Sequence, residues 1–245
     1  MAKHLFILIY QYIGMRTKII SFCVAALLLA GVSVKAQSNG QLRVGLNLAN
    51  VSVTDNGRVN DANMLTSFQV GFVGDAHLAS IVYLQAGLLL TGKGAKLQSG
   101  STGSANYYKA TSNPYYLELP VTLLLKAPLG GGNSFFVGAG PYIAAGIAGK
   151  NKVEGKFLGI GFNTEKNIRF SNDDPTTLNY EEGAGFSVMK RFDYGVNGTV
   201  GIEGKSLVLG VNYGLGLAKL QSGSNSSQDN DNKNRVVSIT LGFKL

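Results

Sequence analysis

Residues 191–219, RFDYGVNGTVGIEGKSLVLGVNYGLGLAK, decide the fold, because apolar side chains occupy every second position on either side of a short reversal. The apolar positions run from Phe192 to Ile202 and resume at Leu207. A period of two is typical of a β-strand. The stretch therefore predicts two antiparallel strands joined by a tight turn at 204–206, each arm being about ten residues, the length with which a tilted strand crosses a bilayer.

The two faces of this hairpin differ in a way that separates membrane barrels from soluble ones. One face is mostly Gly, Asn and Thr with a few charges, and the other is Leu, Val, Ile and aromatic throughout. A soluble barrel would cover its outer face with Lys, Glu and Arg, whereas small polar residues suit a crowded lumen. We therefore expect the apolar face to contact lipid, with a soluble secreted barrel as the structural alternative.

The composition supports strands as the spanning elements. Only 15% of the 245 residues are charged, against roughly 25% in soluble domains, and the chain has 33 Gly and no Trp. Beyond the N-terminus no run of about 20 apolar residues exists, so spanning helices are excluded there. If the processed chain meets a membrane, strands must cross it.

Residues 1–36 have the pattern of a secretory signal peptide, which leaves 37–245 as the barrel domain. Arg16 and Lys18 precede an apolar core, and small residues around Ala36 form a cleavage site. Met1 or Met15 is the initiator, and an uncleaved anchor is the alternative. Cleavage removes four basic residues and Cys23, which lowers the formal net charge from +8 to +4 and leaves no cysteine. This excludes disulfides and cysteine-bound zinc, and it weakens a nucleic-acid hypothesis.

Eight alternating segments predict an all-β, eight-stranded antiparallel up-and-down transmembrane barrel. The expected strands are 42–49, 68–77, 83–93, 116–126, 136–148, 192–203, 207–217 and 235–245. Long connections at 51–66, 94–114, 150–189 and 221–234 alternate with short ones, as external loops alternate with periplasmic turns. Both mature termini are then expected in the periplasm of an outer-membrane protein. Pro120 cannot donate to the ladder and predicts a bulge or irregular pairing, and the alternating segment 157–162 predicts that the wall extends beyond the membrane as a hairpin.

The alternation assigns nine titratable side chains to the lumen. Four cations, four anions and one histidine are predicted to face inward: Arg43, Lys93, Lys126, Lys244, Asp75, Glu118, Asp193, Glu203 and His77. Eight strands leave an interior that side chains just fill, and buried charges persist only when paired. We therefore expect a structural ion network in preference to a narrow conduit.

His77 is the only histidine in the expected mature chain and is the candidate base of a lipid-modifying enzyme. Its place in the strand order puts it near the periplasmic end, so we expect a hydrogen-bonded lumen histidine instead. Aromatic residues near strand ends are predicted to form interfacial girdles. These are Phe68, Tyr115, Tyr116, Phe192, Tyr194 and Phe243.

Three segments carry a resemblance to a known family. YLELPVTLLLK at 116–126, GPYI at 140–143 and RFDYG at 191–195 are similar to recurring marks of the PorT-like outer-membrane barrels common in Bacteroidota. The resemblance implies an eight-stranded barrel, and a few relatives serve type IX secretion or gliding. The final strand, from Arg235 to Leu245, is similar to the closing strand that barrel-insertion machinery recognises.

Three functions follow as hypotheses. The first is a non-enzymatic barrel with a structural, adhesive or envelope-complex role through its external loops. The second is a conduit or secretion accessory, and the third is a lipid-modifying enzyme. The expected partners are outer-membrane lipid, lipopolysaccharide, the insertion machinery and an envelope protein, with no nucleic acid, cofactor, metal or catalytic residue.

Overall fold

A computed structural model describes residues 39–55, 58–61, 64–99, 104, 106–171, 188–218 and 233–245. The chain divides into two compact units, Met1–Ser38 and Asn39–Leu245. The expected signal peptide and most of the expected 221–234 loop lie outside the described residues. Within those residues, the structure contains no helix that is long and apolar enough to span a bilayer.

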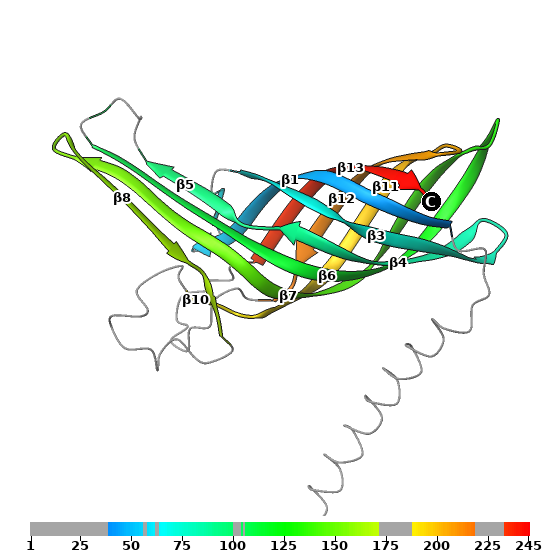
Figure 1. Cartoon of the computed structure of the whole chain (residues 1–245), viewed down its shortest axis with the longest axis horizontal. Coiled ribbons are helices and arrows are strands. Elements are labelled where there is room, and N and C mark those ends of the chain that lie inside the picture. The colour runs from blue at the N-terminus through cyan, green and yellow to red at the C-terminus, as the bar shows by residue number, and fades with distance from the viewer. Residues whose placement is uncertain are drawn as a thin grey trace, which may run out of the picture. The chain divides into compact units, whose positions relative to one another are not determined.

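The second unit is a closed ring of eight antiparallel strands, which confirms the predicted fold (Figure 1). The ring strands, in order, are β1 (Asn39–Asp55), β3 (Leu65–Ala79), β4 (Val82–Gly92), β6 (Tyr107–Gly130), β7 (Asn133–Phe157), β11 (Phe192–Glu203), β12 (Leu207–Gly216) and β13 (Lys233–Lys244). Each strand pairs with its neighbours in sequence order. The first strand pairs with the last from Gln41 opposite Lys244 to Ser52 opposite Lys233, which leaves the ring without a free edge.

The aliphatic rows of this ring point outward. In β13 the buried Ser238 and Thr240 are each 4% exposed, whereas Ile239 between them is 56% exposed. The same alternation runs through β6 and β12. Because the polar residues fill the interior and the apolar residues cover the wall, the ring has the inside-out distribution that contact with lipid requires.

Short turns join the strands at one end of the ring, here called the turn end. β3 and β4 are separated by residues 80–81, β6 and β7 by 131–132, and β11 and β12 by 204–206. Gly131 and Gly132 adopt positive φ angles of 64° and 82°, which glycine tolerates without steric cost. The first residues of β1 and the last of β13 also lie at this end, because the short turns and these chain ends share one side of the up-and-down ring.

At the opposite end the wall continues as a sheet extension, defined as β5 (Ala95–Ser99), β8 (Ile160–Asn167) and the adjoining parts of β6 and β7. The strands pair in the order β5-β6-β7-β8, so the expected loop at 94–114 instead contains β5 and the first part of β6. The predicted hairpin beyond the barrel is present in β7 and β8. The expected 51–66 loop likewise contains the end of β1 and β2 (Arg58–Asp61). Two short strands, β9 (Arg169–Phe170) and β10 (Val188–Met189), form a separate parallel pair.

Of the two outcomes predicted at Pro120, a bulge or irregular pairing, the structure shows the second. The pairing of β6 with β4 is interrupted between Val121 and Glu118, and its pairing with β7 is interrupted between Pro120 and Leu123, without a change of register. The register shifts of β6 lie between Tyr115 and Tyr116 and near Pro128. At the first of these, Tyr115 opposes Ala148 whereas Tyr116 opposes Gly146, so β7 carries one extra residue where the extension leaves the ring.

Candidate functional site

Eight of the nine predicted lumen residues do lie inside the ring, where they form two ion networks. Seven of these charged residues are buried, and the eighth, Lys244, is half-buried. They arrive there because each occupies the inward parity of its strand. One network lies toward the extension and the other at the turn end, so both ends of the lumen are occupied.

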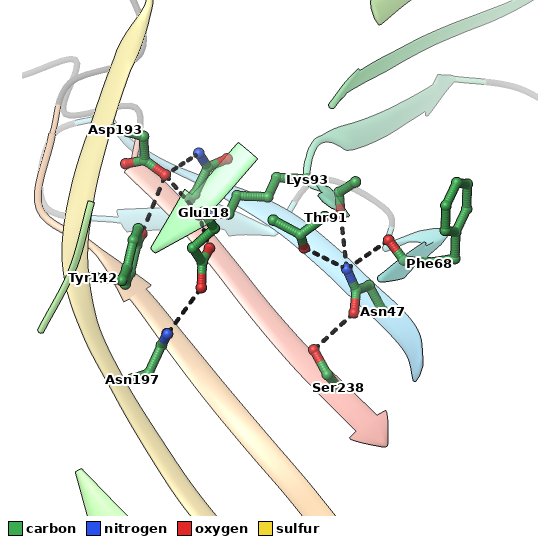
Figure 2. Close-up of polar contacts among 11 residues, drawn as sticks. Asn47, Phe68, Thr91, Lys93, Glu118, Tyr142, Asp193, Asn197 and Ser238 are labelled. Atoms are coloured by element: carbon green, nitrogen blue, oxygen red, sulfur yellow. Dashed lines mark hydrogen bonds and ion pairs between the residues drawn. The ribbon is translucent and has the colours of Figure 1, made fainter. Parts of the chain in front are cut away.

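The network toward the extension is centred on Lys93, which is 3% exposed. Its Nζ lies 2.8 Å from Glu118 Oε2 and 2.9 Å from Asp193 Oδ2 (Figure 2). The same ammonium group lies 4.0 Å from the centre of the Tyr142 ring. Two carboxylates and an aromatic face therefore surround one cation, which is the environment a desolvated lysine needs.

Neutral side chains complete this network. Asn234 Nδ2 and the Tyr142 hydroxyl donate to Asp193 Oδ2 at 3.1 and 3.2 Å, and Asn197 Nδ2 donates to Glu118 Oε1 at 3.0 Å (Figure 2). These donors come from three different strands. They orient both carboxylates toward Lys93 and distribute the negative charge over several hydrogen bonds.

The network at the turn end is centred on Lys126. Its Nζ lies 2.7 Å from Asp75 Oδ2 and also pairs with Glu203, which in turn pairs with Lys244. The amide group of Gln85 donates to Asp75 Oδ1 at 2.7 Å, and Arg43 donates to Gln85 Oε1 at 3.0 Å. A chain of cations, anions and amides thus crosses the lumen at this end.

An uncharged cluster around Asn47 lies between the networks. Its Nδ2 donates to Thr91 Oγ1 at 2.9 Å and to the carbonyl oxygens of Phe68 and Gly92, and its Oδ1 accepts from Ser238 at 2.8 Å (Figure 2). Both the nitrogen and the oxygen of this amide are hydrogen-bonded. The alternation predicts an inward position for these neutral side chains, but it does not predict which of them pair.

The charges of the two networks balance each other. The network toward the extension carries an excess of one negative charge, and the network at the turn end carries an excess of one positive charge. Between them remains a cavity of about 40 Å³, lined by residues from all eight ring strands, among them Arg43, Glu118 and Ser238. A cavity of this size holds only a few water molecules. Side chains therefore fill most of the lumen between the two networks.

His77 departs from the expectation that it faces the lumen. The side chain is exposed at the turn end, where its Nε2 lies 2.9 Å from the carbonyl oxygen of Ser80. Its ring is tilted against that of Tyr83, with the ring centres 4.9 Å apart. His77 still pairs with Tyr83 in the regular register, and the register of β3 shifts only after it, before Ala79. Its exposure follows from its place at the end of the strand, beyond Asp75, the last buried residue of β3. It contacts neither ion network.

Five of the six predicted girdle residues are compatible with an outward position. Phe68, Phe192, Tyr194 and Phe243 are exposed, and half-buried Tyr115 packs against the Phe68 ring at 5.5 Å. Tyr116 is the exception and its assignment was wrong. It is fully buried, packs on Tyr142 and Ala144, and meets the Phe170 ring edge-on at 5.8 Å, because it shares the inward parity of Glu118.

The described part of the chain offers no metal centre. No group of three or more His, Cys, Asp or Glu side chains among these residues gathers as metal ligands would. The carboxylates of the lumen instead face lysine. The ion pairs and hydrogen bonds of these lumen side chains join the strands of the ring and so stabilise its closed wall.

Solved structures that resemble this chain include an attachment invasion locus protein, an outer membrane protein and a Neisserial surface protein. The attachment invasion locus protein Ail of Yersinia pestis shares 11% identity, with 85% of this chain and 99% of that chain covered, at a TM-score of 0.38. OprG from Pseudomonas aeruginosa shares 12% identity over 87% and 99%, at 0.33, and the Neisserial surface protein NspA shares 8% over 83% and 97%, at 0.34. Comparison with curated proteins gave no match.

The sequence itself matches one family over most of its length. Residues 35–222 match the outer membrane protein beta-barrel domain. This match includes seven of the eight ring strands, and the remaining strand closes the ring against β1. The closed ring, its apolar exterior and this match agree, and the chain belongs to the outer membrane protein beta-barrel domain family.

Proposed function

We propose that the protein is a closed, non-enzymatic outer-membrane barrel that acts as a docking or adhesive surface through its sheet extension. The observation that carries this proposal is the filled lumen, because ion networks occupy both ends and leave only about 40 Å³ between them. A barrel that lacks an open channel can contact partners in the surrounding water only through its two ends. At the end opposite the short turns, the wall continues beyond the ring as the sheet extension.

The orientation is part of the same proposal. Membrane barrels of this type have short periplasmic turns and longer external loops. The turn end, with both mature termini, is accordingly the periplasmic end, and the extension stands outside the cell. Export through a cleaved signal peptide and recognition of the final strand by the insertion machinery fit this orientation.

The tip of the β7–β8 hairpin has the character of a contact surface. Leu158, Ile160 and Phe162 are 74%, 76% and 45% exposed. Leu158 also has a φ of 51°, a left-handed conformation that costs roughly 1 kcal/mol or more for a residue with a bulky side chain. Exposed apolar side chains held in a strained turn are typical of a functional contact. An envelope protein or an apposed apolar surface is the partner that this tip suits.

Two measurements test the proposal. In planar bilayers the purified barrel should show no steady conductance, and a stable open level would favour the second candidate function, a conduit or secretion accessory of the PorT-like kind. In adherence assays, cells that carry Ile160→Asn should attach to a hydrophobic surface less than cells with the unchanged barrel. Equal attachment of the two strains would contradict an adhesive tip.

Orientation is tested separately with single cysteines, because the expected mature chain has none. Ile160→Cys should react with a membrane-impermeant maleimide on whole cells, and Lys205→Cys, in the turn between β11 and β12, should react only after lysis. The reverse pattern would show that the extension faces the periplasm. An enzyme is the least supported candidate, since His77 contacts no candidate nucleophile among the described residues. Lipid A of unaltered mass in a deletion strain is the expected result.

A further inference from the structure

The sheet extension has two chemically different faces. Ser112 and Tyr116 of β6 are buried toward the lumen, so the alternate positions of β6 continue the outer, lipid-facing side of the ring. Residues that oppose each other across paired strands share a face. Pairing of Thr111 with Lys96 and Lys152, and of Lys109 with Glu154, extends this outer face over β5 and β7. The lysines on the outer face are Lys96, Lys109, Lys150, Lys152 and Lys156.

This outer face carries an excess of three positive charges. Two glutamates, Glu154 and Glu165, share it with the five lysines. The inner face of the same strands is mostly apolar or neutral, with Tyr108, Val153 and Phe162 on it, and Lys166 is its charged residue among the paired positions. The positive charge is therefore segregated to the side that continues the lipid-facing wall.

The lysines begin where the lipid-facing surface ends. Ile143 and Ile147 of β7 are 62% and 55% exposed on the outer side, and no charged residue stands between them on that side. At about 3.3 Å per residue, Lys150 and Lys152 lie about 7 and 13 Å along the strand from Ala148. The strand tilt shortens these heights to about 5 and 10 Å. Lipid headgroups occupy a layer of about 5–8 Å beside the hydrocarbon core. Lys150 therefore stands within the headgroup layer, and Lys152 stands just above it, where its long side chain can reach back to the phosphates.

Some of these lysines already hold a carboxylate, and others do not. Lys150 pairs with Glu165, and Glu154 pairs with both Lys109 and Lys152. Among the residues that the structure describes, no carboxylate lies within ion-pair distance of Lys96 or Lys156. All of these pairs are exposed or half-buried, so they exchange readily with an external anion.

We propose that the outer face of the extension binds the phosphate groups of anionic lipids in the leaflet that surrounds the barrel. Lys150 and Lys152 contact the phosphates nearest the hydrocarbon, Lys96 lies in the same cross-strand row as Lys152, and Glu165 competes with phosphate for Lys150. Continuity with the lipid-facing wall selects a membrane lipid as the occupant. The lysine excess selects an anionic headgroup. This inference rests on the proposed outward placement of the extension and names its lipid partner.

Native mass spectrometry of the refolded mature chain tests the proposal. The protein, in non-ionic detergent, is titrated with lipid A that carries phosphate and, in parallel, with the same lipid A after phosphatase treatment. Three variants are compared: Lys150→Gln with Lys152→Gln, the matched control Lys166→Gln on the inner face, and Glu165→Gln. Each variant is first checked for folding by its heat-dependent gel migration.

Phosphorylated lipid A should bind, and each outer-face lysine removed should weaken its apparent Kd by about fivefold. Lys166→Gln should leave the affinity unchanged. Glu165→Gln should tighten binding, a gain that misfolding cannot produce. Equal binding of phosphatase-treated lipid, or equal losses for outer-face and inner-face variants, would overturn the proposal.

Two further results place the phosphate on the lipid and separate this inference from the proposed function. Inorganic phosphate should not displace the lipid, and displacement would show a free-anion site instead. Binding in detergent does not depend on orientation in the cell. Loss of binding with correct cysteine labelling therefore refutes the lipid site alone, whereas reversed labelling refutes the proposed orientation.

Discussion

Replacement of Lys93 by methionine isolates the ion network toward the extension. Lys93→Met keeps the length of the side chain and removes the cation that Glu118 and Asp193 share at 2.8 and 2.9 Å. Two buried carboxylates then lack a counter-ion. Removal of one partner from a buried ion pair costs about 3–5 kcal/mol, so we expect this loss in the free energy of unfolding.

The partner substitutions set the scale of that effect. Glu118→Gln leaves the pair of Lys93 with Asp193 intact, keeps an acceptor for Asn197 and brings this network to zero net charge. Its expected cost is about 1 kcal/mol or less. The triple change Lys93→Met, Glu118→Gln and Asp193→Asn leaves no uncompensated ion, and it should recover most of the loss.

Equilibrium unfolding in urea, with the barrel refolded into lipid vesicles, measures these differences. Circular dichroism and gel migration report the folded fraction, since the chain has no tryptophan. A loss of less than about 1 kcal/mol for Lys93→Met, or no difference from Glu118→Gln, would show that water screens these carboxylates. The description of this part of the lumen as closed would then be wrong.

Three further predictions concern the wall and the extension. A Cβ at Gly140 would lie 1.9 Å from a carbonyl oxygen of β6, whereas a Cβ at Gly74 would meet no atom within 4 Å. Gly140→Ala should therefore reduce the yield of folded protein seen on gels, and Gly74→Ala, the control, should give the wild-type yield. Leu46→Lys, on the lipid-facing wall, should cost about 2–4 kcal/mol in urea unfolding, and Ile160→Lys at the hairpin tip should change stability by less than about 0.5 kcal/mol. A hydrogen bond from Lys150 lowers the pKa of Glu165. The stabilisation of the hairpin by this pair is therefore fully present above the ordinary glutamate pKa and is lost as pH falls through the lowered pKa. Amide exchange in β8 should rise in that pH range, and Glu165→Gln should remove the pH dependence.

The strand number and the facing of the wall were predictable because both depend on local alternation. Ile239 must point away from Ser238 in any extended strand, whatever the strand pairs with. The same parity rule places Tyr116 on the inward face together with Glu118. The alternation therefore predicts a buried Tyr116, and the girdle assignment was inconsistent with it. His77 was misplaced for a different reason. It stays in register with Tyr83 but lies beyond Asp75, the last buried residue of β3, and the alternation does not mark where the enclosed lumen ends.

The extension was underestimated because its strands are stabilised by pairing across long sequence separations. Lys109 of β6 opposes Glu154 of β7. The Gly- and Ser-rich stretch before Lys109 has no strong strand pattern by itself, and neither has the mixed segment that follows Lys109. Pairing with β7 supplies the hydrogen bonds that make the first part of β6 a strand. Composition therefore predicted a loop where the neighbouring strand imposes a sheet.

The sequence by itself determined that this chain forms an eight-stranded barrel with an apolar exterior, because a side-chain period of two needs no knowledge of partners. Only the tertiary structure decided that Lys93 joins Glu118 and Asp193, that Lys126 joins Asp75 and Glu203, and that the lysines of the extension share its outer face. The physical reason is register: which inward or outward residues meet depends on how far each strand slides along its neighbours, and that offset is set when the ring closes.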